Sequence, residues 1–188
     1  MIGAANPCAK QPSKPRRNMP YVYRVARWTH GATEVVYVRG YEIGNRALFQ
    51  LETMPRPPES EAKVAHLERM IDQRLAALAR DLNEAASSIH RVLEENGVVW
   101  PGKPAPRVVI QAPVSTRRAA VYLGLLEDFD ALAGALEVLH RAGLVTKNAY
   151  RRAIYGWQRR LVRWALSTAA TIQRDMHLPR NPQRRKPT

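Results

Sequence analysis

Cysteine is almost missing from this chain, since Cys8 is the single one among 188 residues. One thiol cannot form an internal disulfide or a cysteine-rich zinc site, which excludes a disulfide-stapled fold. Long apolar runs are missing too, and none approaches the roughly 20 residues that span a bilayer. The opening residues hold no long apolar segment of the kind found in secretion signals. We therefore expect a cytoplasmic protein in a reducing compartment, without membrane association.

Sequence motifs of catalysis are lacking as well. The chain contains no GxSxG, HExxH or Walker motif and no glycine-rich dinucleotide turn. The histidines occur singly, without partners at metal-ligand spacing: His30, His66, His90, His140 and His177. We interpret the acidic cluster of Glu127, Asp128 and Asp130 as a solvated face or as ion-pair partners for C-terminal arginines, not as acid–base catalysts. We expect no enzymatic activity, metal, cofactor or small-molecule ligand.

What the chain has in excess is positive charge, and this charge lies at its two ends. The net charge is +14. Residues 1–18 carry four Lys or Arg and no acid, while residues 147–186 carry eleven and one acid, Asp175. The stretch 19–146 is therefore neutral. Cationic ends on a neutral body indicate that the protein binds a polyanion such as DNA, because neutralising its phosphates releases condensed counterions and so favours binding. The alternative is a solvated basic face with a disordered tail.

Composition and periodicity divide the chain into three parts. The prediction is a disordered basic arm at 1–19, a single mainly helical domain at 20–176, and a basic tail at 177–188. Within the domain, the β-branched and aromatic run Val35-Val36-Tyr37-Val38 favours a strand. We expect extended structure at about 21–39, with a hairpin turn at His30-Gly31-Ala32. Residues 41–54 are ambiguous between strand and short helix.

Three long helices are predicted further on, and these decide the fold class. Their expected bounds are about 60–96, 115–142 and 146–176, and a short strand is expected at 107–112. Asn96-Gly97 is expected to stop the first helix, Ser115 or Thr116 to start the second, and Thr146 to cap the third. In the first of these helices, Ile71, Leu78, Ala85 and Val92 recur every seven residues. Such a stripe needs a helical partner, either within the chain or from a second subunit. The expected fold is α+β and mainly α, with long helices in an antiparallel or bundle arrangement and a short β-ribbon.

The strand at 107–112 holds the candidate residues for reading DNA bases. If Val108 and Ile110 face the core, then Arg107, Val109 and Gln111 face outward, because successive strand side chains point to opposite sides. Arg and Gln can pair bidentately with guanine and adenine in the major groove. A two-stranded ribbon fits that groove, and a homodimer would pair this strand with its copy. The alternative is an edge strand with polar outward residues.

Helix starts and basic residues supply candidate phosphate contacts. Thr146, Lys147 and Asn148 open the last helix, whose free N–H groups and dipole suit an anion. The remaining candidates are Arg117, Arg118, Arg151, Arg152, Arg184 and Arg185. Tyr150, Trp157 and Trp164 share one helical face, so we interpret most of them as core residues; the alternative is a stacking platform for single strands.

The stretch from about 107 to 165 resembles the AcaB-like proteins of integrative conjugative elements and conjugative plasmids. The residues that carry the resemblance are a strand ending in Pro113, an Arg-Ala-Ala-x-Tyr-Leu helix start, a Leu-x-x-Phe-Asp centre, a Gly-Leu turn and a basic final helix. The resemblance implies a dimeric DNA-binding regulator of transfer genes, of ribbon-helix-helix type. It implies base contacts by Arg107, Val109 and Gln111 and phosphate contacts by Thr146, Lys147 and Asn148.

One departure from ordinary ribbon-helix-helix proteins is the length of the helix at 115–142. It leaves the TEVVYVR segment as a rival recognition ribbon. The leading functional hypothesis is a sequence-specific regulator that binds double-stranded DNA as a homodimer. An alternative is a structural or assembly protein of conjugation, in which the helix from Val64 to Val92 docks a partner and the basic tail grips DNA nonspecifically. An RNA-binding helical module is a third hypothesis, although the chain shows no RNA-specific motif.

Overall fold

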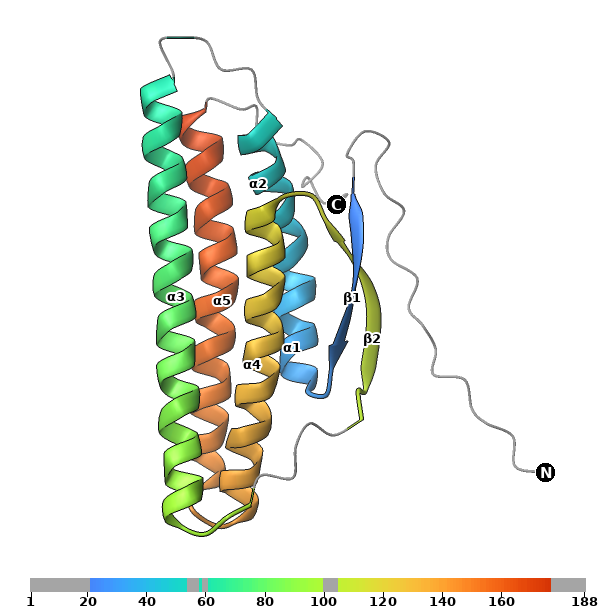
Figure 1. Ribbon diagram of the computed structural model, residues 1–188, viewed down its shortest axis with the longest axis vertical. Helices are drawn as coiled ribbons and strands as arrows, with labels where there is room; N and C mark the ends of the chain where they lie inside the picture. Colours follow the sequence, from blue (N-terminus) through green and yellow to red (C-terminus); the bar gives the residue numbers. More distant parts are fainter. Residues whose placement is uncertain (1–20, 54–57, 59–60, 100–104, 177–188) are drawn as a thin grey trace, which may run out of the picture.

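Three long helices form the body of the molecule, with a shorter helical segment and a two-stranded ribbon packed beside them (Figure 1). The computed structural model describes residues 21–53, 58, 61–99 and 105–176. The long helices are α3 (Glu61–Glu95), α4 (Arg117–Arg141) and α5 (Lys147–Asp175). The predicted fold class, α+β and mainly α, is confirmed. The predicted arm at 1–19 and the tail at 177–188, with Arg184 and Arg185, lie outside the described residues.

The seven-residue stripe of α3 is buried against α4 and α5 of the same chain. Ile71 and Leu78 are buried, but the stripe leaves the core further on, where Val92 is 37% exposed and Leu93 is buried instead. A straight helix drifts by about 20° per heptad relative to a seven-residue repeat, so the buried track moves to the next position. The partner that the stripe needs is therefore supplied within the chain. The helix ends as predicted at Asn96-Gly97, where Gly97 has φ +65.

The predicted hairpin between residues 21 and 39 is wrong in its second half. The first half is strand β1 (Val22–Trp28), but helix α1 (Gly31–Val36) begins directly after His30. It continues through a π-helical turn, η1 (Tyr37–Tyr41), into α2 (Glu42–Thr53), which also resolves the ambiguous segment as helix. Val36 is fully buried while Val38 is 65% exposed, and such burial at helical spacing outweighs the strand propensity of the β-branched run. The TEVVYVR segment is thus no recognition ribbon.

Close packing explains why this helical segment carries glycines. A Cβ on Gly40 would lie 3.0 Å from the hydroxyl of Tyr122 and 3.4 Å from the Cα of Val162. That hydroxyl donates a hydrogen bond to the carbonyl oxygen of Leu161 at 3.0 Å. Gly40 therefore lets the π-helical turn approach both α4 and α5.

The ribbon consists of β1 and β2 (Val108–Val114), paired antiparallel, with Val25 opposite Gln111 and Arg27 opposite Val109. The predicted strand thus pairs with β1 of its own chain, not with its copy in a second subunit. The pairing was missed because β1 precedes β2 by about eighty residues of sequence. Ala26, Trp28 and Ala112 are fully buried on the inner face, which packs against α4. The opposite face of the ribbon is directed away from the helices.

The caps of the last two helices agree with the sequence. Thr116 precedes α4, and its side chain accepts a hydrogen bond from the N–H of Ala119 at 3.0 Å. Thr146 does the same for α5 through the N–H of Ala149 at 3.2 Å. A short turn that contains Gly143, at φ +75, reverses the chain between the two helices. Among the described helices, none is long and apolar enough to cross a membrane.

Candidate nucleic-acid interface

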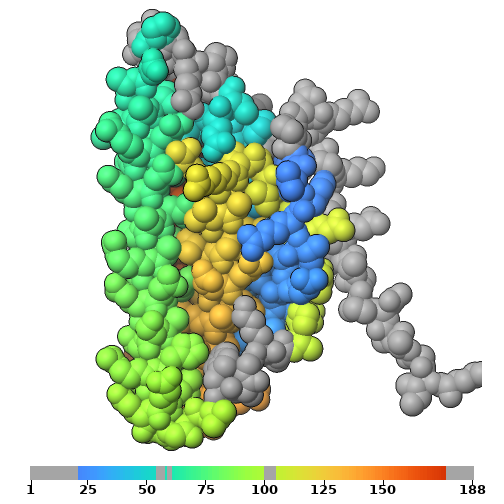
Figure 2. All heavy atoms as spheres, in the orientation of Figure 1, coloured from blue at the N-terminus to red at the C-terminus, as the bar shows by residue number. Residues whose placement is uncertain are grey.

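The outer face of the ribbon is an exposed surface of mixed polar and apolar side chains. Val109 and Gln111 are exposed as predicted, and their partners across the ribbon, Arg27 and Val25, are exposed too. The apolar members are well exposed, at 44% for Val25 and 50% for Val109. In Figure 2, β1 (blue) lies on the surface beside α4 (yellow to orange), while α3 (green) covers the other side. The ribbon therefore offers side chains of base-reading type that no described part of the chain covers.

A basic cleft lies at the base of the ribbon, where β2 begins and the α4–α5 turn ends. We define the basic cleft by its cationic residues: Arg107, Arg141, Lys147 and Arg151. Its volume is about 560 Å³, and Glu137 is the one carboxylate that lines it among the described residues. Arg107 is held in place by its backbone N–H, which donates to the carbonyl oxygen of Trp28 at 2.8 Å. Three of the predicted DNA contacts, Arg107, Lys147 and Arg151, are thus brought together from two elements.

The start of α5 adds a second source of positive potential to the basic cleft. Lys147 is the first residue of this helix, and Arg151 lies one turn further on. The first N–H groups of a helix have no partner within the helix, and its dipole places partial positive charge at this end. Thr146 satisfies the N–H of Ala149, and Asn148 is exposed beside it. The arrangement favours an anionic group at the mouth of the cleft.

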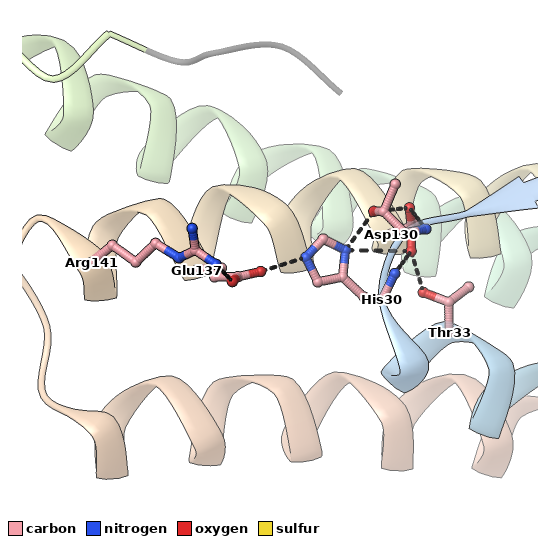
Figure 3. A network of polar contacts seen from close by, with 6 residues as sticks. His30, Thr33, Asp130, Glu137 and Arg141 are labelled. Atoms are coloured by element: carbon pink, nitrogen blue, oxygen red, sulfur yellow. Dashed lines mark hydrogen bonds and ion pairs between the residues drawn. The ribbon is translucent and has the colours of Figure 1, made fainter. Parts of the chain in front are cut away.

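A polar network forms the wall of the basic cleft (Figure 3). It runs from Arg141 to Glu137 at 2.5 Å, and from Glu137 to the Nε2 of His30 at 3.0 Å. The carboxylate of Asp130 lies on the other side of the His30 ring, 3.5 Å from Nδ1. Hydrogen bonding to Asp130 and then to Glu137 raises the pKa of His30 above its usual 6.5, although burial alone would lower it. A charged His30 is therefore favoured between two carboxylates.

Asp130 itself is buried and accepts four hydrogen bonds from the segment that follows β1. Its donors are the backbone N–H of Thr29 and of His30, both at 2.9 Å, and the hydroxyls of Thr29 and Thr33 at 2.8 and 3.0 Å. Burial alone would raise the pKa of this carboxyl, but the hydrogen bonds lower it to about 2. Asp130 thus fixes the junction between ribbon and α1, which forms one side of the basic cleft.

The interpretation of the acidic cluster was therefore wrong for Asp130 and for the partner of Glu127, whereas Asp128 is exposed as expected. Asp130 is buried instead of solvated, and its partners lie at the end of β1 rather than among the C-terminal arginines. Glu127 pairs with Arg24 on the inner face of the ribbon, at 2.6 Å. Nor is His30 isolated. About one hundred residues separate it from Asp130, and no local pattern in the sequence connects the two.

The remaining predicted phosphate contacts do not join the basic cleft. Arg117 and Arg118 begin α4, whose length places them about 36 Å from Arg141 at 1.5 Å per residue. Arg118 is already engaged, with Asp72 at 2.6 and 2.8 Å and with Glu52 at 3.4 Å. Its guanidinium ties α4 to α3 and α2, so we leave it out of the interface. Arg152 is exposed on an adjoining face of α5.

The aromatic side chains of α5 divide between core and surface. Trp164 is buried, and Tyr150 stacks on His140 with ring centroids 5.6 Å apart, so the interpretation as core residues is largely confirmed. Trp157 is partly buried under the guanidinium of Arg160, which lies 4.4 Å from its ring centroid. Sequence reasoning missed Tyr155, which is 60% exposed. Its signal was present, since it lies off the apolar face of the helix.

Comparisons with known proteins identify a related fold. No family model matches the chain, and no curated protein matches it. Among solved structures, the crystal structure of selenomethionine-containing AcaB from uropathogenic E. coli is similar, with a TM-score of 0.76. The match covers 85% of this chain and 84% of that chain, at 21% sequence identity. The helices and ribbon described above are therefore arranged as in AcaB.

Proposed function

We propose that this protein is a sequence-specific, double-stranded DNA-binding regulator of transcription on a conjugative or other mobile element. The observation that carries the proposal is the meeting of Arg107, Lys147 and Arg151 in one cleft at the base of a two-stranded ribbon whose outer face is exposed. The basic cleft offers four cations against one carboxylate, a balance that favours phosphate. The ribbon offers side chains that can discriminate bases.

In the proposed complex the ribbon enters the major groove, which is about 12 Å wide and admits a two-stranded β-ribbon. Gln111 suits adenine, and Arg27 and Arg107 suit guanine. Val25 and Val109 offer apolar contact to thymine methyl groups. Lys147 and Arg151 would hold the backbone beside the groove, which sets the register of the ribbon without reading sequence.

The proposed role as a regulator rests on similarity to AcaB and AcaB-like proteins. The fold of AcaB supports it, and so does the resemblance of residues 107–165 to AcaB-like proteins of conjugative elements. We propose a cytoplasmic homodimer, in which each protomer would place its own ribbon on one half-site. Because β2 already pairs with β1, this dimer would form through surfaces other than the paired strand edges. An enzymatic role, a metal or a cofactor is not part of the proposal.

The assembly hypothesis loses its main support in the fold. It required the apolar stripe of α3 to dock a partner, but Ile71, Leu75 and Leu82 on that stripe are buried against the chain's own helices. A partner would meet the outer side of α3, which is mostly polar apart from the exposed Val92. We therefore favour the DNA-binding proposal.

Selection from a random duplex library tests the proposed function. The full-length protein is expected to enrich one sequence motif, and Gln111→Ala is expected to relax the motif at one position. Arg117→Ala, a change of one exposed charge far from the cleft, serves as the control and should leave the motif intact. A library that stays random after several rounds would contradict sequence-specific binding.

A further inference from the structure

A row of exposed side chains follows α5 away from the basic cleft. Its members, here called the α5 row, lie four residues apart: Lys147, Arg151, Tyr155, Arg159 and Arg163. Residues four apart are neighbours on a helix surface, and each step advances about 6 Å along the axis. All five side chains are exposed. The row therefore forms a continuous cationic track with one aromatic ring at its centre.

The cations of the α5 row carry unneutralised charge. Within the described part of the chain, no carboxylate forms an ion pair with Lys147, Arg151, Arg159 or Arg163. The neighbouring Arg160 differs, since it pairs with Asp81 of α3. The one acid of α5, Asp175, lies at the opposite end of the helix and contacts Arg174. An anionic partner outside the chain would supply the missing charge.

A hollow of about 470 Å³ opens beside the centre of the α5 row. Gly156 lines it, and a Cβ there would meet no atom within 4 Å. The guanidinium of Arg160 covers Trp157 at 4.4 Å, and both residues line the hollow. Tyr155 precedes Gly156 in the chain, and the guanidinium of Arg159, which also lines the hollow, lies 5.7 Å from its ring centroid. Flat cationic and aromatic groups thus lie at or next to an open space large enough for a base.

We propose that the α5 row binds single-stranded nucleic acid. Phosphates of the strand lie along the cations, while bases stack on Tyr155 and on the Arg160–Trp157 pair. Aromatic rings and Arg guanidinium planes are the groups on which unpaired bases stack, and such stacking tolerates any sequence. Bases of an intact duplex are already stacked on one another and do not reach these groups. The α5 row shares Lys147 and Arg151 with the basic cleft, so the test rests on Tyr155, Arg159 and Arg163, which belong to the α5 row alone.

The test is fluorescence anisotropy of the full-length protein with a labelled oligothymidylate and, in parallel, with a random duplex of equal length. The variant Arg159→Glu/Arg163→Glu is expected to weaken oligothymidylate binding by more than about tenfold, with a change of under about threefold for the duplex. The control Arg80→Glu/Arg91→Glu reverses two exposed charges on α3 and should change neither by more than about threefold. The proposal would be overturned if Arg159→Glu/Arg163→Glu lowered the affinity for oligothymidylate and for duplex equally. It would also be overturned if the control variant lowered oligothymidylate affinity as much.

A second variant separates stacking from charge. Tyr155→Ala keeps the net charge and removes an exposed ring, so the protein should fold. It is expected to lower oligothymidylate affinity by about tenfold, in line with the loss of one stacked base. Unchanged affinity would overturn the proposal. If the duplex selection finds no motif while these losses are observed, only the proposed regulatory function fails.

Discussion

The carboxylate of Asp130 accepts a 2.9 Å hydrogen bond from the backbone N–H of His30. His30 is the N-cap residue of α1, directly after the ribbon, whereas Asp130 lies in the middle of α4. The contact therefore fixes the place where the strand ends and the helix begins. It also holds the His30 ring beside Glu137 in the wall of the basic cleft. The folding of the β1–α1 junction and the shape of the candidate interface depend on the same carboxylate.

Replacement of Asp130 should destabilise the fold strongly. An Asn at this position has one acceptor oxygen for four donors, and its NH₂ group would face N–H groups. We expect Asp130→Asn to lower the free energy of unfolding by about 3 kcal/mol, measured by urea denaturation. Glu127→Gln is the control, because its partly exposed ion pair with Arg24 should contribute less than about 1 kcal/mol. Equal effects of the two substitutions would contradict the role of Asp130.

The pH dependence of stability should report on His30. Its pKa is raised in the folded protein, so its stabilising contribution is complete below the unfolded value of 6.5 and is lost as the pH rises through the folded value. We expect the difference in unfolding free energy between the wild type and His30→Gln to be greatest at about pH 6 and to shrink as the pH rises through the raised pKa of His30. Urea titrations at several pH values measure this difference. A difference that grows with pH would have the wrong sign.

Two glycines of the helices should respond oppositely to alanine. At Gly40 the new Cβ would press on the Tyr122 hydroxyl, so Gly40→Ala should cost about 1–3 kcal/mol of stability. At Gly124 on α4 a Cβ would meet no atom within 4 Å, so Gly124→Ala should stabilise by up to about 1 kcal/mol. Thermal unfolding monitored by circular dichroism measures both. A stabilising Gly40→Ala would contradict the close packing of the π-helical turn.

Base-reading and phosphate-binding residues should have separable effects on DNA binding. Arg107→Ala or Gln111→Ala should reduce the preference for the selected site over random duplex. Arg151→Ala, and Arg184→Ala in the tail, should weaken binding to the selected site and to random duplex alike. Each should also reduce the slope of log affinity against log salt concentration by about one. Competition binding at fixed salt measures the preference. Equal loss on specific and random DNA for Arg107→Ala would remove Arg107 from the reading surface.

Local patterns predicted the parts of this fold that local interactions determine. The Thr116 and Thr146 caps, the stop at Gly97 and the alternation around Val109 were all readable from neighbouring residues. The segment at 33–39 was not, because its helix depends on burial against α4 and α5.

The candidate site was predictable in the same uneven way. Lys147 and Arg151 were predicted from the start and the charge of the last helix and Arg107 from the strand, and the structure adds Arg141 beside them. The contacts of His30 with Asp130 and Glu137 span about one hundred residues, and no periodicity encodes them. The pairing of β1 with β2 is likewise a contact between distant parts of the sequence, so no turn residues of the kind that mark a local hairpin announce it.

The salt dependence of duplex binding tests the central proposal most directly. Fluorescence anisotropy would compare a fragment from upstream of the protein's own operon with random duplex, from about 50 to 200 mM salt. The account predicts that the upstream fragment is bound tightly across the series, while affinity for random duplex falls steeply. Weak binding of equal strength to both duplexes, lost at the upper end of the series, would contradict a sequence-specific regulator.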